Sequence, residues 1–198
     1  MKLNLEELKQ SKLYSEELDI DLSSRSDSDI FKWFLASVLF GARISEEIAM
    51  RTYRSFARQR LLTPRRILDA GWDFLVNPVM REGGYVRYDE KTSREILDNC
   101  DMLLRQYDGS LNRLHELAKD PRDLERRILE FYGIGPVTAN IFLRELRPFW
   151  SKAEPESLDI VKELARKYHI SLLRLDRKSI EFARVEAGLI RRRRMLRR

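Results

Sequence analysis

Hydrophobic residues recur along most of this chain with the three- and four-residue spacing of α-helices. Between residues 30 and 42 apolar side chains fall on every face, which predicts a buried helix. Residues 96–107 carry a single apolar stripe, typical of a helix with one face in the core. The sequence lacks alternating β-branched runs flanked by turn residues. These patterns predict about ten helices and no sheet, and therefore an all-α protein.

Residues that commonly begin and end helices divide the chain into short elements. We expect helix starts at Ser28–Asp29, Ser45, Thr63 and Asp120. Ser, Thr and Asp cap helix N-termini, and the last two positions precede a proline, which fits the first helical turn. Thr92 or Ser93 is expected to begin the helix with the 96–107 stripe, and Asp108–Gly109 to end it. The single cysteine, Cys100, lies on that stripe and is expected to be an inert core thiol.

The most regular part of the chain is residues 28–147, which we expect to form one helical lobe. Residues 1–27 and 148–198 would form a second lobe in which the chain ends pack together. With one cysteine the chain holds neither an intramolecular disulfide nor a four-cysteine metal site. The first residues lack the apolar stretch of a signal peptide, and the longest apolar stretch is too short to cross a bilayer. We therefore expect a cytoplasmic protein without membrane contact.

Positive charge is concentrated at the C-terminal end. The formal net charge is +6, and residues 184–198 contain seven arginines and one glutamate. A basic tail indicates a polyanionic partner, nucleic acid first, with a solvated helical face and an anionic membrane as alternatives. Arginine richness with few Gln and Asn is also typical of thermophilic proteins.

Two glycines separated by one apolar residue join the predicted helices of segment 121–146. Pro136 fits the first turn of the second helix, where its missing N–H costs nothing. The remaining N–H groups there would point outward at the positive end of the helix dipole, which favours phosphate binding. An ordinary helical hairpin is the alternative. The expected phosphate contacts are Gly133, Ile134, Gly135, Val137 and Thr138.

The segment GIGPVTANIFL resembles the helix-hairpin-helix motif of the endonuclease III-like DNA glycosylases, the helix-hairpin-helix-GPD superfamily. The segments DIFKWFLASVLFGARISEEIAMRTYRSF and REGGYVRYDEKTSREILDNCDMLL are similar to earlier parts of that family, so the resemblance covers about residues 28–168. It implies two helical lobes with a cleft. It also implies a double-stranded DNA partner, from which a damaged or mismatched base is flipped out before its N-glycosidic bond is hydrolysed in base-excision repair.

The chain lacks two chemical features of this family. Val137 occupies the position of the lysine that gives bifunctional members their strand-cleaving activity, so the resemblance implies a monofunctional glycosylase without AP-lyase activity. The four-cysteine loop is also missing, so no iron–sulfur cluster is expected. No cofactor is required beyond, at most, a monovalent cation at the hairpin carbonyls. The arginines expected to take over the phosphate contacts of that loop are Arg191, Arg192, Arg193 and Arg194.

The resemblance also calls for a carboxylate that stabilises charge on the sugar and orients the attacking water. Asp159 is the best candidate, although it lies about one helical turn further from the hairpin than usual. Its alternative role is to cap a helix. Glu154 and Glu156 are the fallback carboxylates.

Aromatic and basic residues in the turn at 83–91 are candidates for contacting a flipped base or filling the gap that it leaves. These are Tyr85, Arg87 and Tyr88, with Arg43 from another turn; packing on the body or plain exposure is the alternative.

His115 and His169 lack metal-site spacing, and no metal is expected. The resemblance thus implies a monofunctional DNA glycosylase of undetermined target base, and we expect a monomer. A non-catalytic DNA-binding protein and a partner-binding helical protein are the alternatives.

Overall fold

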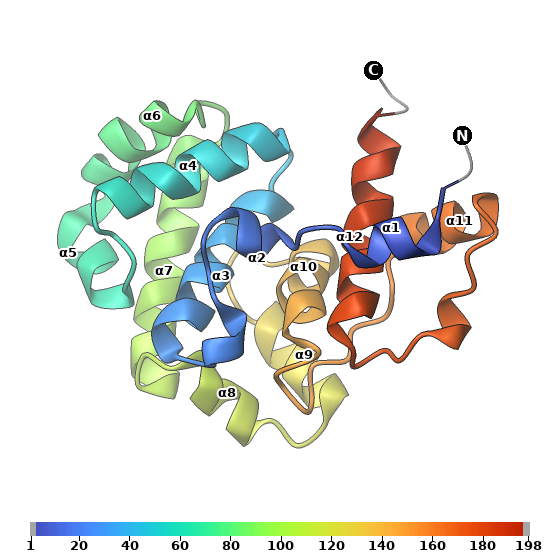
Figure 1. Cartoon of the computed structure of the whole chain (residues 1–198). Coiled ribbons are helices and arrows are strands. Elements are labelled where there is room, and N and C mark those ends of the chain that lie inside the picture. Colours follow the sequence, from blue (N-terminus) through green and yellow to red (C-terminus); the bar gives the residue numbers. More distant parts are fainter. Residues whose placement is uncertain (1–2, 196–198) are drawn as a thin grey trace.

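The computed structural model describes the backbone of residues 3–195 and the side chains of residues 3–192. Throughout this range the regular elements are helical, and none of the described residues forms a strand, as predicted (Figure 1). The first half contains α1 (Leu5–Lys9), α2 (Tyr14–Glu17), η1 (Leu22–Ser24), α3 (Asp27–Gly41), α4 (Glu46–Arg58), α5 (Pro64–Phe74), η2 (Leu75–Met80) and α6 (Arg81–Gly83). The second half contains α7 (Asp89–Tyr107), α8 (Leu111–Leu117), α9 (Pro121–Leu129), α10 (Pro136–Leu146), α11 (Asp159–Lys167), η3 (Leu172–Arg174) and α12 (Ile180–Met195).

Three of the predicted caps are confirmed. The side chains of Ser45, Thr63 and Asp120 each accept the backbone N–H of the residue three positions on. The start of the buried helix differs by about two residues, because Ser26 rather than Ser28 caps α3 by accepting the N–H of Asp29.

The start of α7 was predicted three to four residues too late. The helix begins at Asp89, directly after Tyr88, whose φ of +66° places it in the left-handed region. Asp89 and Glu90 then occupy the first turn, where the helix dipole favours acidic side chains. The predicted end is confirmed, because Asp108 and Gly109 both have positive φ angles.

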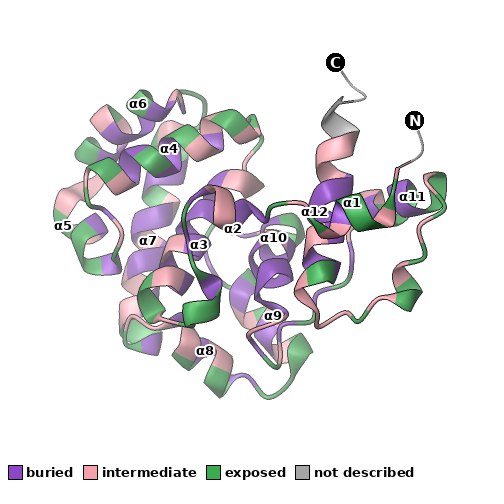
Figure 2. Ribbon diagram, in the orientation of Figure 1, coloured by how far each residue is buried: buried purple, intermediate pink, exposed green. Residues whose placement is uncertain are grey.

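Helix α3 forms the centre of the main core (Figure 2). Its indole Trp33 Nε1 donates to the carbonyl of Phe142 in α10 at 3.0 Å, which ties the two helices together. The helices also approach closely at Gly41, where an added Cβ would lie 1.9 Å from Thr138 Oγ1. Cys100 is buried in this core, and burial raises the pKa of its thiol, in keeping with the inert role predicted for it.

Both chain ends contribute to a second, smaller cluster of buried apolar residues. Helix α1 packs against α12, which also contacts α11, and the three lie together in Figure 1. The main cluster, however, includes Tyr14 near the start of the chain and Trp150 after α10. The two clusters therefore do not divide at residues 27/28 and 147/148, where the sequence placed the lobe boundaries. No helix among the described residues has the length and apolar character needed to cross a bilayer.

Candidate nucleic-acid interface and adjoining cavity

A tight turn connects α9 to α10 and is held in place by α7. Gly133 has a φ of +71°, a conformation that favours glycine, while Ile134 is buried between the helices as the sequence predicted. Asn99 of α7 fixes the turn through Tyr132: its Oδ1 accepts the Tyr132 N–H at 2.7 Å, and its Nδ2 donates to the Tyr132 carbonyl at 3.0 Å. These two hydrogen bonds hold the turn against α7.

The start of α10 is open on its outer side. Gly135 is the N-cap, and none of the described side chains caps the first turn, in contrast to α4, α5 and α9. An added Cβ on Gly135 would meet no described atom within 4 Å, and Val137 is 53% exposed. Thr138 is different, because its side chain is buried against Gly41, so only its backbone is available to a ligand. Uncapped N–H groups at the positive end of a helix suit an anion.

An acidic side chain lies against the same turn. An added Cβ on Gly133 would lie 2.5 Å from Glu95 Oε2, and the carboxylate is paired with Lys91 at 3.5 Å. A carboxylate at this position opposes phosphate binding, although the lysine offsets part of its charge. The carbonyls of Phe131 and Tyr132 accept hydrogen bonds from within the protein. Two hairpin carbonyls therefore already have hydrogen-bond donors, and the monovalent cation expected at the hairpin carbonyls stays a prediction.

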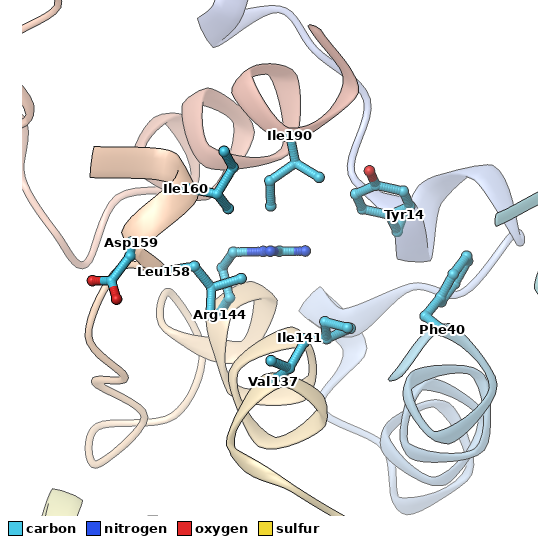
Figure 3. Close-up of a pocket in the computed structure, with 9 residues that line it drawn as sticks. All are labelled: Tyr14, Phe40, Val137, Ile141, Arg144, Leu158, Asp159, Ile160 and Ile190. Atoms are coloured by element: carbon cyan, nitrogen blue, oxygen red, sulfur yellow. The ribbon is translucent and has the colours of Figure 1, made fainter. Parts of the chain in front are cut away.

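A cavity of about 390 Å³ opens beside the first turn of α10 (Figure 3). Its volume is within the range of small-molecule sites, roughly 300–1,000 Å³. Its lining residues come from α2, α3, α10, α11 and α12, and from the residue before α11: Tyr14, Phe40, Val137, Ile141, Arg144, Leu158, Asp159, Ile160 and Ile190. The cavity thus brings together two residues singled out in the sequence, Val137 of the hairpin and the candidate carboxylate Asp159.

Asp159 is at the edge of this cavity and not deep inside it. Its side chain is 95% exposed, and Figure 3 shows the carboxylate pointing away from the cavity. The nearest cation is Lys162, with Nζ 3.9 Å from Oδ1. Leu158 is the N-cap of α11, so Asp159 is its first residue and does not cap it with its side chain. The fallback carboxylates Glu154 and Glu156 form ion pairs with Arg177 outside the cavity lining.

Arg144 is the one charged side chain that the cavity buries. It is 2% exposed, and Figure 3 shows its guanidinium among the apolar lining residues. The adjacent Glu145 is also fully buried; its two carboxylate oxygens accept the N–H groups of Tyr14 and Ser15, each at 3.0 Å. Burial raises the pKa of Glu145, and this effect outweighs the opposing effects of Arg144 and the two N–H donors. Glu145 thereby holds Tyr14 in the cavity wall.

The predicted base and gap contacts separate in the structure. Tyr85 is buried in the core with its hydroxyl 2.8 Å from Thr92 Oγ1, so its ring is not on the surface as the sequence suggested. Tyr88 is half-exposed and Arg87 stacks on its ring at 4.9 Å, which leaves this pair at the surface. Arg43 is exposed in the turn after α3. None of these residues lines the cavity described above.

The first arginines of the basic tail have partners within the protein. Arg191 donates to the carbonyl of Lys12, pairs with Glu17 at 3.2 Å and stacks on Tyr14 at 4.4 Å. Arg192 lies 3.9 Å from a carboxylate oxygen of Glu7. In the structure Arg191 therefore joins the chain ends instead of being presented to solvent as predicted. The side chains of Arg193 and Arg194 lie outside the described residues.

His115 is half-buried and makes structural contacts. His115 stacks on Trp150 with centroids 4.7 Å apart, and its Nε2 accepts the backbone N–H of Lys152 at 3.3 Å. Lys152 Nζ donates to the carbonyls of His115 and Glu116. In the part of the chain that the structure describes, no group of three or more His, Cys, Asp or Glu residues is placed to hold a metal.

Arg144 is the residue that sequence reasoning missed. It shares a face of α10 with Val137 and Ile141, at spacings of four and three residues, and all three line the cavity. A charged residue on an otherwise apolar stripe was the available signal. Nothing in the sequence indicated that Tyr14 and Phe40 would line the cavity, because their place there depends on packing against helices distant in sequence.

No family model, curated protein or solved structure matches this chain in the comparisons made.

Proposed function

We propose that this chain binds duplex DNA through the 121–146 hairpin and acts as a monofunctional DNA glycosylase on a base flipped into the adjoining cavity. The hairpin supplies backbone N–H groups to a phosphate, and the cavity receives the base. The fixed turn at Gly133 and the open N-terminus of α10 support this use of the hairpin.

A single observation carries the proposal: Val137 from the first turn of α10 and Asp159 from the first turn of α11 border the same cavity. A strand held at the start of α10 would present its sugar at the cavity mouth, where Asp159 lies. The base would enter between Phe40, Ile141 and the residues around them. The N-terminal ends of two helices face this mouth, which favours the negatively charged DNA backbone.

In the reaction, water attacks C1′ of the sugar, and the C1′–N bond breaks with its electron pair leaving on the base, which is then protonated. Asp159 would accept the proton of the water and stabilise positive charge on the sugar. Its side chain must turn toward the cavity to do so. Val137 has no nucleophilic group, so no covalent link to the sugar forms and the strand is not cleaved by the protein.

Catalysis is tested by incubating the protein with duplexes that each contain one uracil, G·T mismatch, oxidised guanine or alkylated purine, and by measuring abasic sites. We expect release of at least one base, no adduct after borohydride treatment, and loss of release in Asp159→Asn with DNA affinity unchanged. Glu163→Gln, which removes an exposed carboxylate from the same helix, is the matched control. Release that persists in Asp159→Asn would remove Asp159 from the mechanism.

The hairpin is tested separately with Gly135→Ala. The added methyl meets no described atom within 4 Å, so the protein should fold, but it occupies open space at the start of α10 that an approaching phosphate would need. We expect duplex affinity to fall about tenfold, as loss of a charge-assisted hydrogen bond implies. Unchanged affinity would exclude the start of α10 as the phosphate site.

A non-catalytic DNA-binding protein is the second candidate. The outward direction and 95% exposure of the Asp159 side chain favour it, since no carboxylate among the described residues then faces the cavity. This candidate predicts duplex binding that Gly135→Ala weakens, without base release from any duplex of the panel.

A further inference from the structure

The cavity contains a positive charge whose hydrogen-bond donors are unused. Arg144 is 2% exposed, and its Nε and Nη1 atoms have no hydrogen-bond partner among the described residues. The guanidinium lies 5.7 Å from the ring centroid of Tyr14 and is surrounded by apolar lining residues (Figure 3). Leaving such donors buried and unpaired is costly, and folded proteins seldom do so without a reason.

The neighbouring carboxylate does not satisfy Arg144. Glu145 Oε1 lies 3.9 Å from Arg144 Nη2, beyond hydrogen-bond distance, and both Glu145 oxygens already accept backbone N–H groups. The other fully buried arginine, Arg147, provides an internal comparison. Both of its terminal nitrogens donate, one to Glu186 and one to the carbonyl of Pro155. Among the described residues Nε lacks a partner in both arginines, but the terminal nitrogens of Arg147 both have acceptors, whereas Arg144 Nη1 has none and the Glu145 ion pair at 3.9 Å is too long for a hydrogen bond.

The chemistry of the guanidinium limits what it can recognise. Its N–H groups are all donors, so it pairs with oxygen or nitrogen acceptors and not with amino groups. Apart from Asp159, whose carboxylate points away at the edge, the other lining side chains are apolar or aromatic and include the rings of Tyr14 and Phe40. This combination suits a flat heterocycle that carries carbonyl oxygens on one edge. Arginine commonly reads guanine in this way, through O6 and N7.

We infer that Arg144 determines specificity by donating hydrogen bonds to a carbonyl oxygen of the base, so that the cavity takes neutral keto bases and rejects cationic alkylated purines. This inference rests on the proposed function. A fixed positive charge in an apolar cavity repels a cationic base more strongly than it would in water. Adenine is disfavoured because it presents an amino donor where the keto bases present an oxygen.

The first experiment compares release of uracil and hypoxanthine with release of cationic 7-methylguanine from otherwise identical duplexes. We expect the wild-type protein to prefer the keto bases at least tenfold. Arg144→Met should reduce this ratio at least tenfold, Arg144→Lys should retain part of it, and duplex affinity should stay the same. Arg105→Met, at an exposed arginine of α7, is the matched control. Release without a keto preference, or a ratio that Arg144→Met leaves unchanged, would overturn the inference.

A second experiment separates this inference from the proposed function. Binding of free uracil, hypoxanthine, adenine and 7-methylguanosine is measured by calorimetry without DNA. The proposed function fails if no duplex loses a base. In that case the calorimetry still tests the role of Arg144. Binding that prefers the keto bases and weakens at least tenfold in Arg144→Met supports the inference for a free ligand, and binding without that preference, or no binding, overturns it.

Folding of the variant is checked by its urea midpoint. Arg144→Met takes the positive charge away from buried Glu145, 3.9 Å distant, so this variant should unfold at a lower urea concentration than the wild type, and Arg144→Lys should lie closer to the wild type. A selectivity ratio that Arg144→Met changes no more than a comparably destabilised variant of the other buried arginine, Arg147→Met, would count against the inference.

Discussion

The contact between Gly41 and Thr138 sets the distance between α3 and α10, two helices of the main core. Gly41 of α3 lies directly against Thr138 of α10, near the cavity and the hairpin turn. Neither residue has a special backbone conformation to explain this choice. The requirement is space, since any side chain at position 41 meets a short, β-branched neighbour that has no room to move.

Gly41→Ala is therefore expected to destabilise the protein. The new Cβ would lie 1.9 Å from Thr138 Oγ1, so α3 and α10 must separate, at a cost of about 1–3 kcal/mol in the free energy of unfolding. Urea denaturation measures this change. Adding Thr138→Ala should recover part of the loss, and a double variant no more stable than Gly41→Ala would contradict the contact.

His115 is expected to make stability depend on pH. Its Nε2 accepts the Lys152 N–H, which requires the neutral ring, and burial with Lys152 and Lys178 lowers the pKa of His115 to about 4. The unfolded value of 6.5 is higher, so the unfolded chain binds the proton first as the pH falls. The contribution of His115 is complete above pH 6.5 and is lost as the pH falls toward 4.

Urea denaturation of the wild type and of His115→Gln at pH 7 and pH 4.5 checks this expectation. The decrease in unfolding free energy between the two pH values should be smaller in the variant, by roughly 1–2 kcal/mol once solvent screening is allowed for. An equal decrease in both proteins would assign the pH dependence to other groups.

At the scale of the elements, the turn between α9 and α10 combines an open helix N-terminus with an unfavourable neighbour. Glu95 projects from α7 against Gly133, so a negative charge lies beside the proposed phosphate site. Lys91 lies 3.5 Å from that carboxylate and partly offsets it. A turn of this composition is expected to bind DNA more weakly than its backbone alone would allow.

Glu95→Gln should strengthen duplex binding. Removing one surface charge near a phosphate is worth about 1 kcal/mol or less, which corresponds to a two- to fivefold gain in affinity at low salt. Fluorescence anisotropy with a labelled duplex measures the effect. Asp73→Asn on α5 removes the same charge from an exposed position and should leave affinity nearly unchanged; equal gains in both variants would point to net charge alone.

The elements were largely predictable because their signals are local. The caps at Ser45, Thr63 and Asp120 and the hairpin helices require only neighbouring residues to be recognised. The start of α7 was missed because Tyr88 adopts a left-handed conformation, which tyrosine seldom does and which no sequence rule indicates. Tyr85 was misjudged for a related reason: an aromatic residue beside glycines is equally suited to a surface turn and to the core.

The candidate site was less predictable than the fold. Val137 and Asp159 were both identified, but whether they share a cavity depends on how α10 and α11 pack. The role of Arg191 was also set by tertiary contacts, because its partners Lys12 and Glu17 lie more than 170 residues earlier in the chain. Charge counted along a sequence does not reveal which arginines are already paired.

At the scale of the whole molecule, one buried ion pair joins three parts of the chain. Arg147, directly after α10, contacts Glu186 of α12 and the Pro155 carbonyl in the segment before α11. Both charged side chains are fully buried. Buried pairs are costly to break from one side, because the remaining charge has no partner.

Arg147→Met should therefore lower the unfolding free energy by about 3–5 kcal/mol, as measured by urea denaturation. Arg147→Met combined with Glu186→Met should restore much of that loss, because no buried charge is then left unpaired. A double variant that is less stable than the single variant would show that the pair contributes net stability of its own.

The hydrogen bonds that Glu145 accepts from the N–H groups of Tyr14 and Ser15 limit when this N-terminal segment can pack during synthesis. Tyr14 and Ser15 cannot take their final place until Glu145 of α10, about 130 positions later, has been synthesised. Ile190 then adds a wall from the last helix. A chain synthesised only as far as α10 would contain the hairpin turn but lack the cavity wall at Ile190, so the cavity should form only after residue 190 has been synthesised.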